Sequence, residues 1–73
     1  MMILTTKEID GNEELVGRKL KLIEVSSGAK TFDVGTIVTC IGNYYGCMRV
    51  GIFDKGGIIH ADYVYSDEKW ELV

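Results

Sequence analysis

The chain of 73 residues contains no proline, only two cysteines and a single histidine. A secreted domain of this size usually relies on several disulfides, so two cysteines favour the cytoplasm. Three soft ligands are too few for a structural zinc site. No apolar run approaches the roughly 20 residues that span a bilayer, and the apolar start at residues 1–4 is too short for a secretory signal. We therefore expect a cytoplasmic protein with no membrane association, no metal and no cofactor.

Basic residues are few as well, because 8 Lys and Arg stand against 11 Asp and Glu, which gives a net charge of −3. This balance disfavours a protein that binds nucleic acid, since phosphate contacts depend on clustered cations. Arg18, Lys19 and Lys21 nevertheless form one basic cluster, so a local basic face on an acidic protein remains an alternative. The acids that predominate from Asp54 onward would suit a basic partner, but we favour solvated surface charges.

In the absence of proline, nine glycines separate the short apolar runs of the chain. Such runs at regular spacing, rich in β-branched residues, are typical of small sandwiches and barrels. The sequence predicts five strands, at residues 19–25, 36–41, 47–53, 58–65 and 69–73. Asp54-Lys55-Gly56-Gly57 is the strongest hairpin signal, and a second turn is expected at residues 42–46. Closure of these strands into a barrel would remove the exposed edges of an open sheet.

The remaining segments carry weaker local signals. Residues 2–5 have the composition of a strand, residues 7–11 suggest a turn, and Asn12 is suited to cap a helical turn that ends at Gly17. The alternation of apolar residues changes parity at Ile23, which predicts a bulge in the first clear strand. A polar loop is expected at residues 26–30 and a tight turn at residues 66–68.

Three segments resemble SH3-like small β-barrels, especially short phage and bacterial proteins of that architecture. They are the loop-to-strand entry at residues 32–38, the distal hairpin turn at residues 54–57, and the final strand Trp70-Glu71-Leu72-Val73. The resemblance implies a mostly β fold: a five-stranded barrel at residues 18–73, with an N-terminal extension at residues 1–17 that adds a short strand or a helical turn. The paired tryptophans and the proline of a peptide-binding SH3 groove do not occur here, so recognition of proline-rich peptides is not implied.

Aromatic residues dominate the candidate binding positions. Tyrosine and tryptophan, together with arginine, are the side chains most often found at interaction hot spots. We expect at least one exposed ring at the turn that holds Tyr44 and Tyr45, whereas core packing is favoured for Tyr63 and Tyr65. The candidate binding residues are Tyr44, Tyr45, Arg49, Tyr63, Tyr65 and Trp70.

Groups suited to catalysis are scarce in this sequence. His60 and Asp62 share one face of their predicted strand, but no nucleophile stands beside them, and an exposed polar pair is the favoured interpretation. Cys40 and Cys47 flank a turn; they point to opposite faces if Ile41 pairs with Cys47 and share a face if Gly42 does. Either register makes a strain-free disulfide doubtful, so two half-buried free thiols are expected.

These observations predict a small non-enzymatic protein-binding module or inhibitor, of the kind that phages or mobile elements encode. The partner is expected to be another protein. A nucleic-acid-binding small barrel is the first alternative, in which Tyr44, Tyr45, Arg49 and the Arg18–Lys21 cluster would converge. The second alternative is a self-associating structural subunit that pairs through an exposed strand edge.

Overall fold

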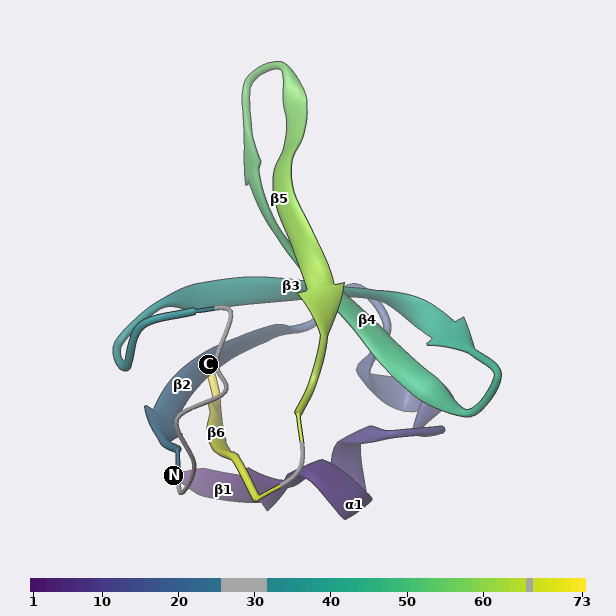
Figure 1. The fold of residues 1–73 in the computed structure, drawn as a ribbon, viewed down its shortest axis with the longest axis vertical. Coiled ribbons are helices and arrows are strands. Elements are labelled where there is room, and N and C mark those ends of the chain that lie inside the picture. Colours follow the sequence, from purple (N-terminus) through teal and green to yellow (C-terminus); the bar gives the residue numbers. More distant parts are fainter. Residues whose placement is uncertain (26–31, 66) are drawn as a thin grey trace.

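Six strands and two short helical segments make up the computed structural model, which describes residues 1–25, 32–65 and 67–73 (Figure 1). The elements in chain order are β1 (Met2–Thr5), α1 (Thr6–Ile9), the 3₁₀ turn η1 (Glu13–Leu15), β2 (Lys19–Glu24), β3 (Ile37–Tyr44), β4 (Cys47–Asp54), β5 (Gly57–Tyr63) and β6 (Lys69–Leu72). The mostly β fold expected from the sequence is confirmed. The loop expected at residues 26–30 and Ser66 of the turn expected at 66–68 lie outside the described residues.

All six strands belong to one antiparallel sheet with the order β1-β6-β2-β3-β4-β5. The segment at residues 2–5 is therefore a strand, which was one of the options expected for the N-terminal extension, and a helix follows it in place of the expected turn. The prediction that closure would remove the strand edges is wrong. β1 occupies the edge of β6 that β2 leaves free, and the sheet ends on β1 at one side and on β5 at the other.

The core lies on one face of this curved sheet, where alternate side chains of the central strands meet. Trp70, Leu20, Leu22, Met48 and Val50 have no exposed surface. The segment before β2 contributes three apolar side chains to the same core, and two residues of β3 and two residues outside the strands complete it. These further core members are Leu4, Ile9 and Leu15, together with Val38, Cys40, Phe32 and Val64.

Hydrogen bonds cap both helical segments of the N-terminal region, and a further hydrogen bond joins this region to the sheet. The Glu8 carboxylate accepts hydrogen bonds from the Thr5 amide at 2.9 Å and the Thr5 hydroxyl at 3.1 Å, which closes the first turn of α1 and holds the pKa of Glu8 below its usual value. The Asn12 side chain accepts from the Glu14 amide at 3.1 Å and caps η1, as predicted. The Asp10 carboxylate then accepts from the Met48 amide at 2.9 Å, which ties this segment to β4.

Register shifts occur at three places in the sheet. The bulge predicted at Ile23 is confirmed, because the pairing of β2 with β6 shifts between Leu22 and Glu24. β3 continues to Tyr44, beyond the expected end of the strand, and its pairing with β4 shifts between Cys40 and Gly42. The β4–β5 pairing shifts between Ile52 and Phe53. Each shift bends the sheet, which is how six short strands curve around one core.

Candidate functional site

Three of the six predicted binding residues lie together on the face of the sheet that points away from the core. Gly42 pairs with Arg49 on the neighbouring strand, and Arg49 pairs with Tyr63 on the next. Paired residues project from the same face, and Tyr44 shares that face because it stands two residues after Gly42. We call Tyr44, Arg49 and Tyr63 the tyrosine–arginine face. The two tyrosines are 48% and 39% exposed, and Arg49 between them is partly exposed.

Glycine makes room for the side chains of this face. A Cβ at Gly42 would stand 3.6 Å from the ring of Tyr44, so this ring lies over the glycine. A Cβ at Gly51 would come within 3.0 Å of the Ile41 side chain and 3.2 Å of the His60 carbonyl oxygen, closer than packed atoms normally approach. Gly51 thus leaves room for the Ile41 side chain, whereas a Cβ at Gly42 would make only an ordinary van der Waals contact with the Tyr44 ring.

Tyr45 occupies the turn beside this face in an uncommon backbone conformation. Its φ of 53° and that of Gly46, 80°, place both turn residues in the left-handed region, and the Tyr45 side chain is fully exposed. Hairpins of this kind favour Asn, Asp or Gly at the first of these positions, because their side chains tolerate a positive φ. The expectation of an exposed ring at this turn is confirmed, and the tyrosine stands there against its backbone preference.

Tyr65 and Trp70 lie apart from the tyrosine–arginine face. The Tyr65 hydroxyl donates to the Asp62 carboxylate at 3.3 Å, and its backbone carbonyl accepts from the Thr6 hydroxyl. Trp70 is completely buried in the core and presents no surface to a partner. The core packing favoured for Tyr63 and Tyr65 is wrong, since both rings are more than one third exposed. The reason is that β5 is an edge strand in which no residue is buried, and Tyr65 follows the end of that strand.

His60 is exposed and Asp62 is partly exposed, but the pair does not lie on the outer face of the strand as the sequence suggests. They pair with Ile52 and Val50, whose side chains pack into or against the core, so both residues project from the core side of β5. The His60 ring meets Phe32 edge-on, with ring centroids 5.1 Å apart. His60 thus covers the margin of the core, and Asp62 is engaged with the amide of Tyr63 at 2.7 Å.

The hairpin of β4 and β5 projects beyond the rest of the molecule (Figure 1). We call residues 52–60 the β4–β5 arm. Phe53 and Ile58 pair across the two strands and are 47% and 51% exposed, and the following Ile59 is 61% exposed. These residues could not be identified from the sequence, because alternation in a strand shows two faces without showing which of them is covered. Their apolar character beside the Gly56-Gly57 turn was the only available signal.

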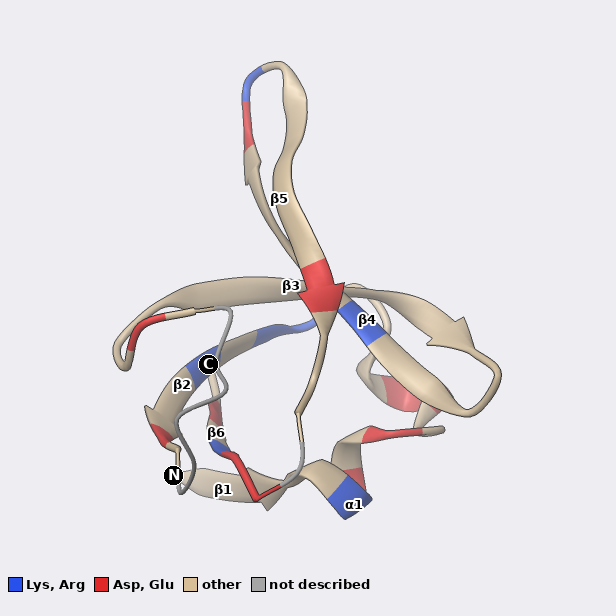
Figure 2. Cartoon of the chain, viewed as in Figure 1, with Lys and Arg blue, Asp and Glu red and all other residues tan. Residues whose placement is uncertain are grey.

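Charge is distributed unevenly over the strands (Figure 2). Lys19 and Lys21 pair with Thr39 and Ile37 and project from the same face of the sheet as Arg49. β3 alone separates the strands that carry these cations. On the outer face of β3, β4 and β5, none of the paired positions carries an acid; they are Ile37, Thr39, Gly42, Tyr44, Cys47, Arg49, Gly51, Phe53, Ile58, Ala61 and Tyr63. The protein is acidic as a whole, but this local face is positively charged.

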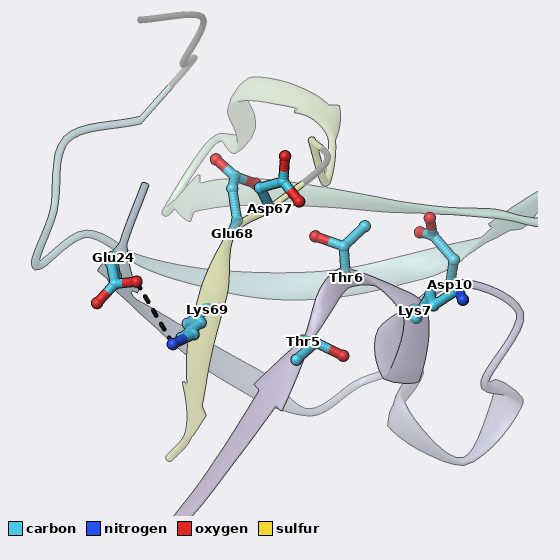
Figure 3. Close-up of a pocket in the computed structure, with 8 residues that line it drawn as sticks. All are labelled: Thr5, Thr6, Lys7, Asp10, Glu24, Asp67, Glu68 and Lys69. Atoms are coloured by element: carbon cyan, nitrogen blue, oxygen red, sulfur yellow. Dashed lines mark ion pairs between the residues drawn. The ribbon is translucent and has the colours of Figure 1, made fainter. Parts of the chain in front are cut away.

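Acids gather instead at an open pocket between the first and last parts of the chain (Figure 3). Asp67 and Glu68 line one side and Thr5 and Thr6 the other; Asp10, Glu24, Lys7 and Lys69 complete the lining. Glu24 and Lys69 form an ion pair at 3.5 Å. Within the described part of the chain, no group of three or more His, Cys, Asp or Glu side chains is arranged to hold a metal ion.

Glu68 is the one buried acid among the described residues, with 3% of its surface exposed. Burial raises the pKa of its carboxyl, and the nearby charge of Asp62 raises it further, while the Tyr65 amide that donates to it at 2.8 Å opposes the shift. The indole N–H of Trp70 lies near enough to favour the charged carboxylate, yet it does not reach hydrogen-bond geometry with any described residue. We therefore treat this proximity as weaker than a hydrogen bond.

The two cysteines are free and point to opposite faces. Cys40 pairs with Val50 and is buried, and burial raises the pKa of its thiol to about 11. Cys47 pairs with Tyr44 and is exposed. Neither of the two registers considered from the sequence occurs, because β3 continues to Tyr44 and the bulge falls at Ile41. The half-buried state expected for both thiols is wrong for each of them.

Comparison with protein-family models, with curated proteins and with solved structures yields no match for this chain. Among the described residues, no helix is long and apolar enough to cross a membrane.

Proposed function

We propose that this chain is a small non-enzymatic protein-binding module or inhibitor that contacts its partner through the β4–β5 arm. The observation that carries the proposal is the exposure of Phe53, Ile58 and Ile59 on a hairpin that projects from the sheet. Clustered apolar side chains in water are unfavourable for an isolated monomer and are frequent at protein interfaces. Among the described residues, no strand pairs with the outer edge of β5, so this edge could add a partner's strand to the sheet.

The strand order supports an SH3-like architecture for residues 18–73. In the order β6-β2-β3-β4-β5, the last strand lies beside the first of the set, and the other strands follow one another as a meander. This is the arrangement that the resemblance implies, with β1 as an addition at the edge of β6. A barrel of this type leaves its hairpins free to vary, which suits a module that inhibits a partner by covering part of its surface.

The proposal is tested by capturing partners from the native host with immobilised protein. The double variant Ile58→Ser/Ile59→Ser removes the apolar surface of the arm, and Val34→Ser, at an exposed position outside it, serves as the matched control. We expect the wild type and the control to recover the same protein in stoichiometric amounts and the arm variant to lose it. Recovery of the same proteins by all three, or of none by the wild type, would contradict the proposal.

Self-association through the same arm is the competing explanation, and native mass spectrometry separates the two. We expect a monomer for both the wild type and the arm variant. A wild-type dimer that the arm substitutions convert to a monomer would identify the second copy as the occupant and would replace the present proposal with a structural subunit.

A further inference from the structure

The tyrosine–arginine face lies next to a row of cations that come from another part of the chain. Hydrogen-bonded pairing runs from Lys19 through Thr39 to Gly51, and Arg49 follows Gly51 by two residues on the same face. Neighbouring strands lie ~4.8 Å apart, so β2 and β4 are separated by roughly 10 Å. Lys19, Lys21 and Arg49 therefore form a short basic track, at the end of which the two tyrosines stand on either side of Arg49.

The charges of this track are not neutralised across β3, β4 and β5. Two acids of β2 and β6 lie on the same face: Glu71 pairs with Lys21 at the far end of the track, and Glu24 forms an ion pair with Lys69 at 3.5 Å. Lys19 and Arg49 face uncharged neighbours, namely Thr39 for the lysine and Gly42 and Tyr63 for the arginine. A polyanion is the partner whose charge complements such a face.

The two tyrosines indicate which kind of polyanion fits this face. The ring of Tyr44 lies over Gly42, and Tyr63 projects beside Arg49, so two exposed aromatic side chains stand beside the cations. Bases of an unpaired strand stack on exposed aromatic rings, whereas the bases of a duplex are already stacked inside it. An acidic peptide would form ion pairs with the cations, but its binding would not require the tyrosine rings.

We propose that the face formed by Lys19, Lys21, Tyr44, Arg49 and Tyr63 binds single-stranded nucleic acid. The phosphates lie along the track from β2 to β4, and two successive bases stack on Tyr44 and Tyr63. This surface adjoins the β4–β5 arm, because Phe53 follows Gly51 by two residues on the same side of β4, but it includes none of the arm's apolar residues. The inference therefore does not rest on the protein-binding role proposed for that arm.

The experiment measures fluorescence anisotropy of a labelled mixed-sequence DNA strand titrated with the full chain. We expect binding at low salt that weakens between about 50 and 200 mM salt, with a logarithmic slope of about −2 for three neutralised phosphates. Arg49→Ala should lower the affinity and flatten this slope. Tyr63→Leu should lower the affinity about tenfold and leave the slope unchanged, since it removes a stacking surface and no charge.

Matched controls keep the result interpretable. Lys55→Ala removes an exposed cation from the tip of the arm, and Ile58→Ser/Ile59→Ser removes its apolar surface; both should bind the strand as the wild type does. Trp70 is buried away from this face, so its emission reports folding of every variant without responding to the bound strand.

Four results of these titrations would overturn the inference, and a competition experiment adds a fifth. These are an unchanged anisotropy at low salt, equal loss of affinity in Lys55→Ala and Arg49→Ala, tighter binding of the matching duplex, and full retention of affinity in Tyr63→Leu. Competition by polyglutamate as strong as that by an unlabelled strand would identify an acidic peptide as the partner and would likewise contradict it.

Discussion

At the scale of single residues, the structure gives related side chains different environments. Glu68 is buried beside Asp62 and the Tyr65 amide, whereas most other carboxyls lie at the surface. Its raised pKa means that the folded chain holds the Glu68 proton more tightly than the unfolded chain. The contribution of Glu68 to the free energy of unfolding is therefore most favourable below its ordinary pKa of 4.5 and becomes less favourable as the pH rises through the folded-state pKa.

Glu68→Gln should consequently raise the free energy of unfolding at neutral pH relative to the wild type. The glutamine oxygen can still accept from the Tyr65 amide, while the buried charge and its repulsion by Asp62 are removed. The gain should grow from pH 4 upward and level off once the wild-type carboxyl is ionised. Urea unfolding at several pH values, followed by Trp70 emission, measures it. Glu14→Gln, at an exposed carboxyl, is the control for loss of one charge, and a gain of equal size at every pH would contradict the assignment.

At the scale of elements, the β3–β4 hairpin shows how a turn accommodates a residue that its backbone does not favour. Tyr45 and Gly46 both have positive φ, and only the glycine adopts that conformation without a steric penalty. The hairpin tolerates the tyrosine because the paired residues on either side, such as Tyr44 and Cys47, hold the register. Strain of this kind is frequent where a side chain serves recognition, and Tyr45 stands beside the tyrosine–arginine face.

Tyr45→Asn should stabilise the protein, since asparagine tolerates the left-handed region better than tyrosine. We expect a gain of about 0.5–1 kcal/mol in the free energy of unfolding. Thermal or urea unfolding checks this, with Tyr44→Asn as the comparison: that neighbouring residue lies in β3, where asparagine is unfavourable, so stability should fall. A loss of stability in Tyr45→Asn would show that the ring has contacts that offset its backbone strain.

At the scale of the whole molecule, the first residues of the chain complete the core that the sheet begins. Leu4, Ile9 and Leu15 are buried in the same cluster as Trp70, and Asp10 binds the Met48 amide across the molecule. A domain of this size has a small core, so each fully buried side chain is a large share of its stability. The segment at residues 1–17 therefore acts as part of the folding unit.

Ile9→Ala tests this role directly, because Ile9 has no exposed surface. Removal of its buried methyl groups should lower the free energy of unfolding by about 2–5 kcal/mol. Val16→Ala, at a position 39% exposed in the same segment, should have a much smaller effect. The two variants are compared by urea unfolding. Equal, small effects would mean that the segment only rests on the sheet.

Features that depend on neighbouring residues along the chain could be predicted from the amino-acid sequence alone. The bulge at Ile23, the cap at Asn12 and the hairpin at Gly56-Gly57 were predictable, because turn and cap residues act over a few positions. The sequence also indicated Tyr44, Arg49 and Tyr63 as candidate binding residues, but it did not show that they share one face of the sheet.

Only the tertiary structure decided which of the two faces of each strand is covered. It placed Trp70 in the core, left Tyr63 exposed and put Phe53 and Ile58 on a projecting arm. It also paired β1 with β6, so that the sheet kept two open edges. The alternation of residues along a strand separates its two faces, but it does not show which face becomes buried. Pairing between distant strands depends on the total burial that the whole chain achieves, which no short segment of the sequence records.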